Sequence, residues 1–101
     1  MERIWMDTTQ IMIRDYPKDD RPRERFIQFG PESLSNQELL ALLLRTGTKE
    51  DSVMNLANQL LAKFGGLRLL KESSIEEMTS IKGIGEAKAV QLAAAMELGR
   101  R

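Results

Sequence analysis

The 101-residue chain contains no cysteine and no histidine, and aromatic residues make up only 5% of it. Without cysteine the chain has no disulfide, no thiolate metal ligand and no thiol nucleophile. Without histidine it also lacks the side chain that most often serves as a general acid or base and as a metal ligand. These absences exclude most hydrolytic enzymes, so we expect a non-enzymatic protein without a cofactor or a metal.

The chain also lacks an excess of either charge, because fifteen Lys and Arg residues balance fifteen Asp and Glu residues. No overall field therefore attracts the chain to nucleic acid or to an anionic membrane, and any DNA binding must come from a local site. The longest strongly apolar run, residues 39–44, is far too short to cross a bilayer, and the N-terminus does not resemble a signal peptide. We therefore expect a cytoplasmic protein with no membrane partner.

What the sequence does contain is a series of helix start and stop signals, which predict an all-α protein. Ser35 with Glu38 and Ser74 with Glu77 have the spacing of capping boxes, and Asp20 and Asp51 or Ser52 are further N-cap candidates. Helices are predicted at about 22–29 and 86–98, and one each after the caps at Ser35, at Asp51 or Ser52, and at Ser74, with a connector helix at 66–71 and terminators at Gly30, Gly47 and Gly65. The leucine-rich second helix is expected to be the most buried. Residues 1–20 are predicted to form an arm, and residues 21–101 one compact domain.

Two parts of this domain match each other with an offset of 36 residues, as shown by Gly47 and Gly83 (83 − 47 = 36). In this register Leu56 corresponds to Leu92, and the match extends over two helices and the turn between them. An internal repeat of this kind predicts two similar structural units. We therefore expect a five-helix bundle of two hairpin units, a degenerate first unit at 31–65 and a second at 72–101, with the short helix at 22–29 outside. The alternative is that two amphipathic hairpins agree by chance.

The second unit has an unusual turn, in which two glycines one residue apart precede a strong helix. Ile81 and Ile84 are expected to anchor this turn, while Gly83 and Gly85 permit positive φ and leave peptide N–H groups uncovered. Since these groups adjoin a helix N-terminus, a phosphate oxygen is the natural ligand, and contacts of this kind hold a nucleic-acid backbone without reading bases. The candidate DNA-phosphate site therefore comprises Lys82, Gly83, Ile84, Gly85 and Lys88.

Several observations limit this interpretation. Glu86 would repel a phosphate, and a tight turn that serves packing alone would explain both glycines although not both lysines. Arg21, Arg23 and Arg25 alternate with acidic residues, which favours a solvated, self-paired face over a phosphate or peptide groove. The turn of the first unit offers a candidate second contact, or else a plain loop, at Arg45, Thr46, Gly47, Thr48 and Lys49.

The second turn resembles the helix-hairpin-helix motif, whose apolar and glycine positions are met by Ile81, Lys82, Gly83, Ile84 and Gly85, and whose following helix has Ala87 and Ala89. The blocks RPRERFIQFGPESLSNQELLALLLRTGT and SIKGIGEAKAVQLAAAMELGRR resemble the N-terminal region of the bacterial RadC family, which is labelled a DNA repair family. The resemblance covers about residues 12–101 and implies a helix-hairpin-helix domain ahead of a metal-binding domain of the JAB/MPN fold. That second domain is absent here, so its metallopeptidase chemistry does not carry over, and an excised fragment or a naturally short form is expected.

Two functions follow as hypotheses. The first is a sequence-nonspecific module that binds the DNA backbone weakly through the second turn. The second is a protein-interaction or regulatory domain that packs on the metal domain of the family or on a repair or replication partner, an alternative favoured by the zero net charge.

Overall fold

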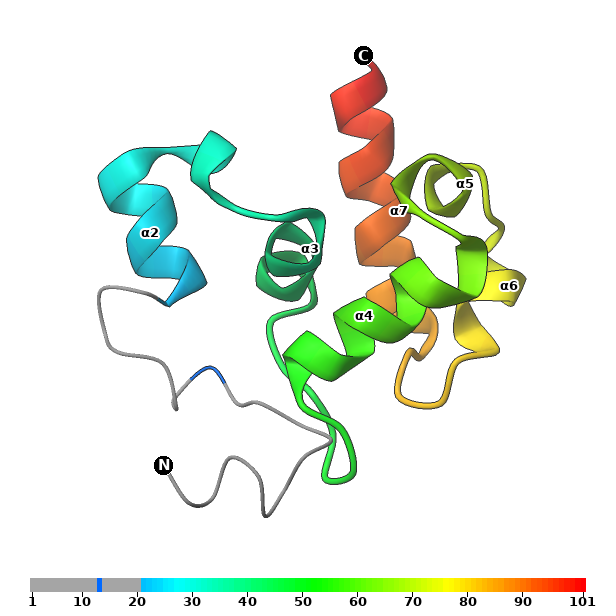
Figure 1. Ribbon diagram of the computed structural model, residues 1–101. Coiled ribbons are helices and arrows are strands. Elements are labelled where there is room, and N and C mark those ends of the chain that lie inside the picture. The colour runs from blue at the N-terminus through cyan, green and yellow to red at the C-terminus, as the bar shows by residue number, and fades with distance from the viewer. Residues whose placement is uncertain (1–12, 14–20) are drawn as a thin grey trace.

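The computed structural model describes residue 13 and residues 21–101, so the predicted arm at 1–20 lies outside the described residues except for Ile13. In the described part the regular elements are all helical, as predicted, and no strand occurs. They are α2 (Pro22–Phe29), the 3-10 turn η3 (Pro31–Ser33), α3 (Asn36–Leu44), α4 (Val53–Phe64), α5 (Leu67–Lys71), α6 (Ile75–Thr79) and α7 (Glu86–Arg100) (Figure 1). The predicted helices are therefore confirmed, and η3 is an addition.

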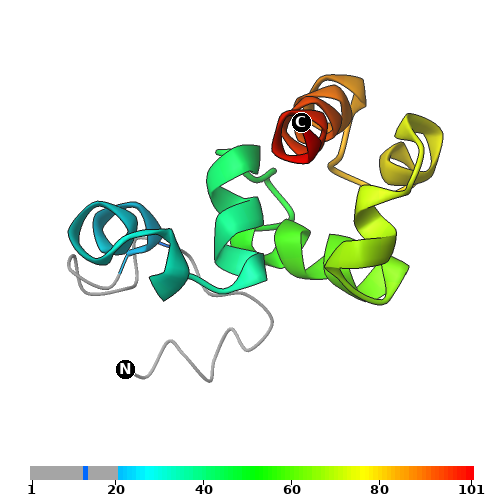
Figure 2. The same ribbon diagram turned by 90° about the horizontal axis from the view of Figure 1, so that it is seen from above.

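The helices form two hairpins, α3 with α4 and α6 with α7, and the short helix α5 connects them (Figure 1). The hairpins are joined a second time because α3 also packs against α7. Seen from above, α2 and η3 lie beyond α3, on the side away from α5 and α6 (Figure 2). The described chain therefore forms two helical hairpins, with α2 outside them.

Local capping chemistry explains most of the helix ends. Ser35 and Ser74 each accept a hydrogen bond from the backbone N–H three residues on and form complete capping boxes, while Ser52 caps α4 through the N–H of Asn55. Gly65 ends α4 in the left-handed conformation, with a φ of 75°.

One predicted helix end and one predicted cap residue are wrong. Helix α3 ends at Leu44 with Arg45 as its C-cap residue, and not at Gly47. The N-cap residue of α2 is Arg21, while Asp20, the predicted cap, lies outside the described residues.

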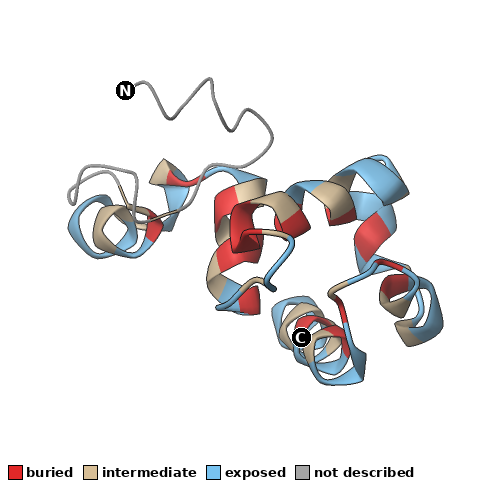
Figure 3. Ribbon diagram, turned by 90° about the horizontal axis from the view of Figure 1, so that it is seen from below, coloured by how far each residue is buried: buried red, intermediate tan, exposed pale blue. Residues whose placement is uncertain are grey.

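The core lies between α3, α4, α6 and α7, whose inward faces carry the buried residues (Figure 3). Helix α3, predicted to be the most buried, has four buried residues among its nine, and α4 has five among its twelve, so the two are buried to a similar extent. One side of α3 faces solvent at Leu43, which is 36% exposed. The fully buried side chains of the largest volume are Leu44, Leu56, Leu60, Leu70, Met78, Ile84, Leu92 and Pro22.

The two hairpins follow the predicted 36-residue register only in part. Leu56 and Leu92 are both fully buried, and α4 and α7 end at equivalent positions (64 + 36 = 100). Their starts differ, because α7 begins at Glu86, which corresponds to Glu50, and α4 begins three residues after that position. The first copy uses these residues for a loop, so its turn differs in shape from that of the second.

Arg25 connects helix α2 to the bundle. The guanidinium of Arg25 contacts the carboxylate of Glu38 with an N–O distance of 2.5 Å, and it also donates to the carbonyl of Ser33. Among the apolar residues of α2, Pro22 is fully buried, whereas Ile27 is 76% exposed and Phe29 63% exposed. The expected self-paired arginine face is thus only partly right: Arg23 does approach Glu24, at 3.9 Å, but Arg25 makes a tertiary contact.

The surroundings of Glu38 give α2 and α3 a dependence on pH. Partial burial raises the pKa of Glu38, but the hydrogen bonds from Ser35 and Arg25 and the charge of Arg25 outweigh it, so the pKa lies below its usual value of 4.5. Because the pKa is lowered in the folded state, the stabilisation is complete above about pH 4.5 and is lost as the pH falls through the folded pKa.

We predict that Glu38→Gln lowers the free energy of unfolding by about 1–2 kcal/mol at pH 7, because the Arg25 contact loses its charge. The difference from the unmodified chain should be smaller at pH 3 than at pH 7, because protonation of Glu38 becomes more favourable as the pH falls below 4.5. Thermal unfolding followed by circular dichroism at both pH values measures this, with exposed Glu72→Gln as the control. An equal loss at pH 3 and pH 7 would show that the ionised form contributes nothing.

Candidate nucleic-acid interface

The turns of the two hairpins lie at the same end of the molecule, opposite the C-terminus (Figure 1). They also touch, because a Cβ atom built on Gly83 would lie 2.9 Å from Cδ2 of Leu56 and 3.2 Å from Cγ2 of Thr48. The two groups of candidate site residues, 36 residues apart in the sequence, are therefore neighbours in space. The two turns therefore form one continuous surface.

The two glycines of the second turn have different structural roles. Gly83 has a φ of 99°, in the region that favours glycine, and no room exists there for a side chain. Gly85 has a φ of −84° and nothing within 4 Å of an added Cβ, so the prediction of positive φ at both glycines is wrong for Gly85. Ile81 and Ile84 anchor the turn as predicted, at 7% and 1% exposed.

Gly85 is the N-cap residue of α7, and its lack of a side chain leaves this helix start open. Helices α3, α4 and α6 each have a serine at this position whose hydroxyl accepts a backbone N–H, but α7 has no side-chain cap. The first N–H groups of a helix have no acceptor within it. The longest helix of the described chain, 15 residues, thus presents uncovered donors at its positive end.

Lys88 is held in place by the first hairpin, a role that the sequence analysis did not anticipate. Its Nζ donates to the carbonyl of Leu44 at 2.8 Å and to Oγ1 of Thr46 at 3.2 Å. Gln91, one turn further along α7, donates to the carbonyl of Leu43. These contacts satisfy carbonyls at the end of α3, so Lys88 has a structural reason to be there, and at most one of its three N–H donors remains for a ligand.

The turn of the first hairpin is closed where that of the second is open. A Cβ on Gly47 would lie 2.3 Å from the carbonyl oxygen of Asp51, so only glycine fits. Oγ1 of Thr48 accepts from the N–H groups of Glu50 and Asp51, at 3.2 and 3.0 Å. Gly47 and Thr48 therefore serve the loop itself, and the amides ahead of α4 are already occupied.

Three exposed cations surround the paired turns. Lys49, Lys82 and Arg45 are exposed, and within the described part of the chain their side chains make no hydrogen bond or ion pair. A hollow of about 410 Å³ lies where the two hairpins meet, and it has no acidic residue in its lining, which comprises Leu44, Arg45, Thr46, Ala87, Lys88 and Gln91. The structure thus brings residues of both predicted groups to one hollow beside the start of α7. Glu86, also exposed, remains the opposing charge.

Arg45 adopts a strained backbone conformation, with φ 73° and ψ −51°, and is the only non-glycine residue at positive φ in the described chain. The N–H of Thr46 donates to the carbonyl of Leu44 at 2.8 Å, which closes a three-residue turn of the less common, strained kind. Strain of this kind often occurs at functional sites. The sequence offered no sign of it, because arginine does not mark such a turn.

Ile13 is the second residue that the sequence analysis missed. It packs against the core and lines a hollow at the first turn with Arg45, Gly47, Thr48 and residues 51–53. Ile13 therefore lies beside the first turn.

Comparison with known proteins places the chain in a family. The profile described as UPF0758 N-terminal matches residues 13–90, which is most of the chain. The chain belongs to the UPF0758 N-terminal family. UPF0758 is the RadC-like family, so the resemblance seen in the sequence is confirmed at this level.

Curated UPF0758 proteins of bacteria are similar over nearly the whole chain. A UPF0758 protein of Geobacillus sp. (strain WCH70) is 70% identical over 91 residues, which is 90% of this chain and 40% of that protein. UPF0758 protein YsxA of Bacillus subtilis is 57% identical over 90% of this chain and 39% of its own length. A relative from Halalkalibacterium halodurans is 55% identical over 95% of this chain and 41% of its own length. The chain thus spans about 40% of these relatives.

No solved structure matches the chain. Among the described helices, none has the length and apolar character needed to span a membrane.

We predict that the glycines of the UPF0758 domain respond differently to alanine. Gly47→Ala should lower the free energy of unfolding by about 2 kcal/mol or more, because its Cβ meets backbone atoms, and Gly83→Ala should also destabilise through its φ and the contact with Leu56. Gly85→Ala should change stability by about 0.5 kcal/mol or less, since a poorer N-cap offsets the reduced freedom of the unfolded chain. Urea unfolding curves measure all three. Equal sensitivity at Gly83 and Gly85 would contradict the geometry.

We also predict that Lys88→Met destabilises the domain by about 1 kcal/mol, because the hydrogen bonds from the ammonium group to the carbonyl of Leu44 and to Oγ1 of Thr46 are lost. For a domain of this size the melting temperature should fall by about 4–8 °C. Lys82→Met is the matched control, since Lys82 is exposed and makes no such contact among the described residues. Calorimetry of both variants makes the comparison, and a loss shared by both would show that charge, not the hydrogen bond, is responsible.

Proposed function

We propose that the domain is a non-enzymatic, sequence-nonspecific DNA-backbone-binding module of a RadC-like, repair-associated protein. In this proposal the hairpins α3–α4 and α6–α7 are two helix-hairpin-helix units, and their adjoining turns face the DNA. The observation that carries it is the start of α7, which is uncapped and lies beside a second turn in contact with it.

The chemistry of this surface suits a phosphate group. Uncovered N–H groups at a helix N-terminus bind anions because the donors and the helix dipole act together. Gly85 allows close approach, since nothing lies within 4 Å of where its side chain would begin. The second turn is therefore proposed to hold a phosphate through the amides after Gly85, with the exposed Lys82 as a cation of the same turn.

The first turn is proposed to contribute side chains instead of amides. Its own backbone donors are taken up by Thr48, but Arg45 and Lys49 remain exposed. A second phosphate would then meet guanidinium or ammonium groups, which bind as charges. The two turns thus form an asymmetric pair, with the amide contact on one side and the ionic contact on the other.

Electrostatics limit the affinity. Glu86 and Asp51 lie close to the same turns, and the whole chain has zero net charge. Binding is therefore expected to be weak. If two phosphates are neutralised, the logarithm of the affinity should fall with the logarithm of salt concentration with a slope of about −2.

A second function, protein interaction, is favoured by a different feature. The surface between α3 and α7 away from the turns includes an apolar groove, and Leu98, close to the end of α7, is 75% exposed. Exposed apolar surface of this kind often marks an interface. We propose that such an interaction, with the rest of the protein or with a repair partner, occurs in addition to DNA binding.

The key prediction concerns Gly85→Ser, which supplies the missing cap. Gly85 has the extended conformation of an N-cap residue, with φ −84° and ψ −179°, so serine fits without strain. The variant should be more stable by about a few tenths of a kcal/mol, yet bind a short duplex about 3-fold to 10-fold more weakly, because the hydroxyl occupies an amide donor. Fluorescence anisotropy at low salt measures the binding.

Lys82→Glu provides the charge arm of the same test. It should abolish measurable binding and leave the melting temperature nearly unchanged. Lys63→Glu, an equal change of charge at an exposed position of α4, should weaken binding only slightly. If the unmodified chain shows no salt-dependent binding to duplex or branched DNA at low salt, DNA binding is wrong and interaction with protein becomes the leading function.

A further inference from the structure

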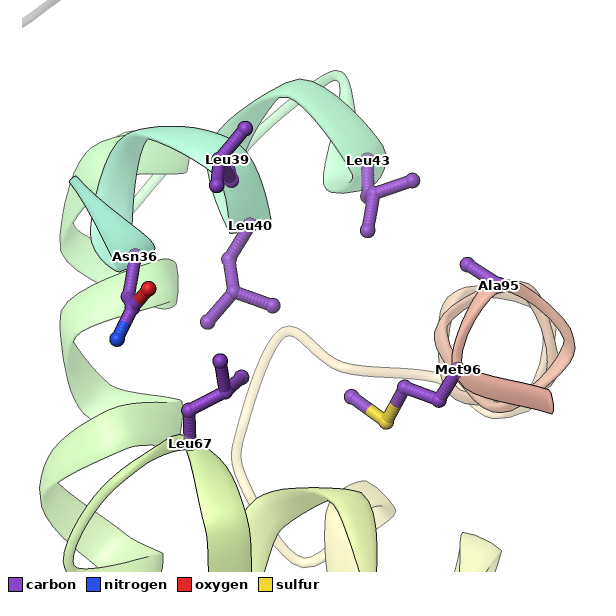
Figure 4. Close-up of a pocket in the computed structure, with 7 residues that line it drawn as sticks. All are labelled: Asn36, Leu39, Leu40, Leu43, Leu67, Ala95 and Met96. Atoms are coloured by element: carbon purple, nitrogen blue, oxygen red, sulfur yellow. The ribbon is translucent and has the colours of Figure 1, made fainter. Parts of the chain in front are cut away.

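A small apolar groove lies between α3, α5 and α7, and the proposed DNA surface does not use it. Figure 4 shows side chains from all three helices around it, with Asn36 the single polar member of the lining. The lining comprises Asn36, Leu39, Leu40, Leu43, Leu67, Ala95 and Met96. Leu43 is 36% exposed at the groove although it belongs to a leucine-rich helix.

The groove has a size that fits one large apolar side chain. Its volume is about 130 Å³, and an apolar cavity of about 150 Å³ accommodates benzene. An anchor such as phenylalanine, leucine or methionine therefore matches it in both volume and polarity. With one anchor, the contact buries far less than the roughly 1,200 Å² typical of a stable interface between separate proteins.

The groove is at the far end of α7 from the proposed DNA contact. Lys88 contacts the end of α3, whereas Met96, eight residues later, faces its beginning (96 − 88 = 8). At about 1.5 Å per residue the two surfaces are separated by about 12 Å along the helix. Both can therefore be occupied at once, and the inference does not depend on the DNA proposal.

We propose that this groove docks the segment that follows α7 in the full-length UPF0758 proteins, through one apolar side chain of that segment. The chain matches the part of the family described as N-terminal and covers only about 40% of the relatives, so most of their length follows it. Met96 precedes Arg101 by five residues, and Leu98 between them is 75% exposed. A segment that leaves α7 is therefore attached next to the groove.

Covalent attachment of the segment compensates for the small area of the groove. A tethered segment binds at an effective concentration in the millimolar range, so a contact too weak to hold two separate molecules can be occupied within one chain. A second copy of the chain has no such advantage, and the groove alone is too small for a stable dimer. The geometry thus favours the following segment over self-association.

The test uses a chimera in which residues 1–101 of this chain are followed by the remainder of the Geobacillus sp. (strain WCH70) relative. Methionine methyl groups are labelled with ¹³C, and a neutral paramagnetic agent in solution reports their accessibility. Met96 lines the groove, while Met54 and Met78 are buried in the core, at 7% and 1% exposed, and serve as internal references. A chain extended by a Gly/Ser tail corrects for the loss of the chain end.

We expect the Met96 methyl to shift and to become at least about 3-fold less accessible in the chimera than in the tailed chain, with Met54 and Met78 unchanged. Ala95→Glu places a charge in the groove, and glutamate is compatible with a helix. This variant should restore the accessibility of the Met96 methyl in the chimera. Val90→Glu is the matched control, since Val90 is half exposed on the same helix and does not line the groove. Leu43→Glu offers a second disruption from the α3 side.

Two results would overturn the proposal. In the first, Met96 has the same shift and accessibility in the chimera and in the tailed chain, whatever the fold of the added segment. In the second, Met96 is protected in the 101-residue chain alone and the protection increases with protein concentration, which would assign the groove to a second copy.

Discussion

The arrangement of the two hairpins depends on the hydrogen bonds that the last carbonyls of α3 accept. The last carbonyls of a helix receive no hydrogen bond from an N–H of the same helix, and α3 does not end in a glycine cap. Besides the N–H of Thr46, which donates to the carbonyl of Leu44, the donors come from α7, more than forty residues away, through Lys88 and Gln91. Because these side chains also bring α7 against α3, the two hairpins are held in one arrangement and their turns are brought together.

These hydrogen bonds link stability with the candidate site. The same lysine that satisfies Leu44 lies in the first turn of α7, next to the uncovered amides, and the same α3 end forces Arg45 into a strained turn. A substitution at Lys88 therefore changes the fold as well as any ligand contact. Lys82, Lys49 and Gly85 are the positions at which function can be tested apart from folding, since their side-chain positions are exposed.

The sequence allowed the helices to be predicted well but not their contacts. Capping boxes at Ser35 and Ser74 and the glycine at 65 act within a few residues, so their signals are visible in the chain itself. The end of α3 was misjudged because its carbonyls are satisfied by residues remote in sequence. For the same reason both lysines of the second turn seemed functional, whereas Lys88 has a structural partner.

The glycines also show that tertiary contacts could not be predicted from the sequence. Gly47, Gly83 and Gly85 look equivalent in the sequence, but neighbouring atoms exclude a side chain at the first two and leave open space at the third. Contact between Gly83 and Leu56 is a tertiary feature that no local pattern indicates. The family resemblance, in contrast, depends on the order of whole blocks, and it was confirmed by the match over residues 13–90.

The difference between the two turns has a consequence for any ligand. The first hairpin uses Thr48 and Ser52 to satisfy its own amides, whereas the second leaves the start of α7 without a cap, although serine at position 85 would fit the backbone. Glycine in place of serine costs about a few tenths of a kcal/mol at an N-cap, so the open start is a small loss for folding. For an anion it is decisive, because a hydroxyl in that place would compete directly for the donors. On the proposed DNA surface, the amide contact at α7 would therefore fix the position of one phosphate, while the exposed side chains of the first turn would adapt to the next.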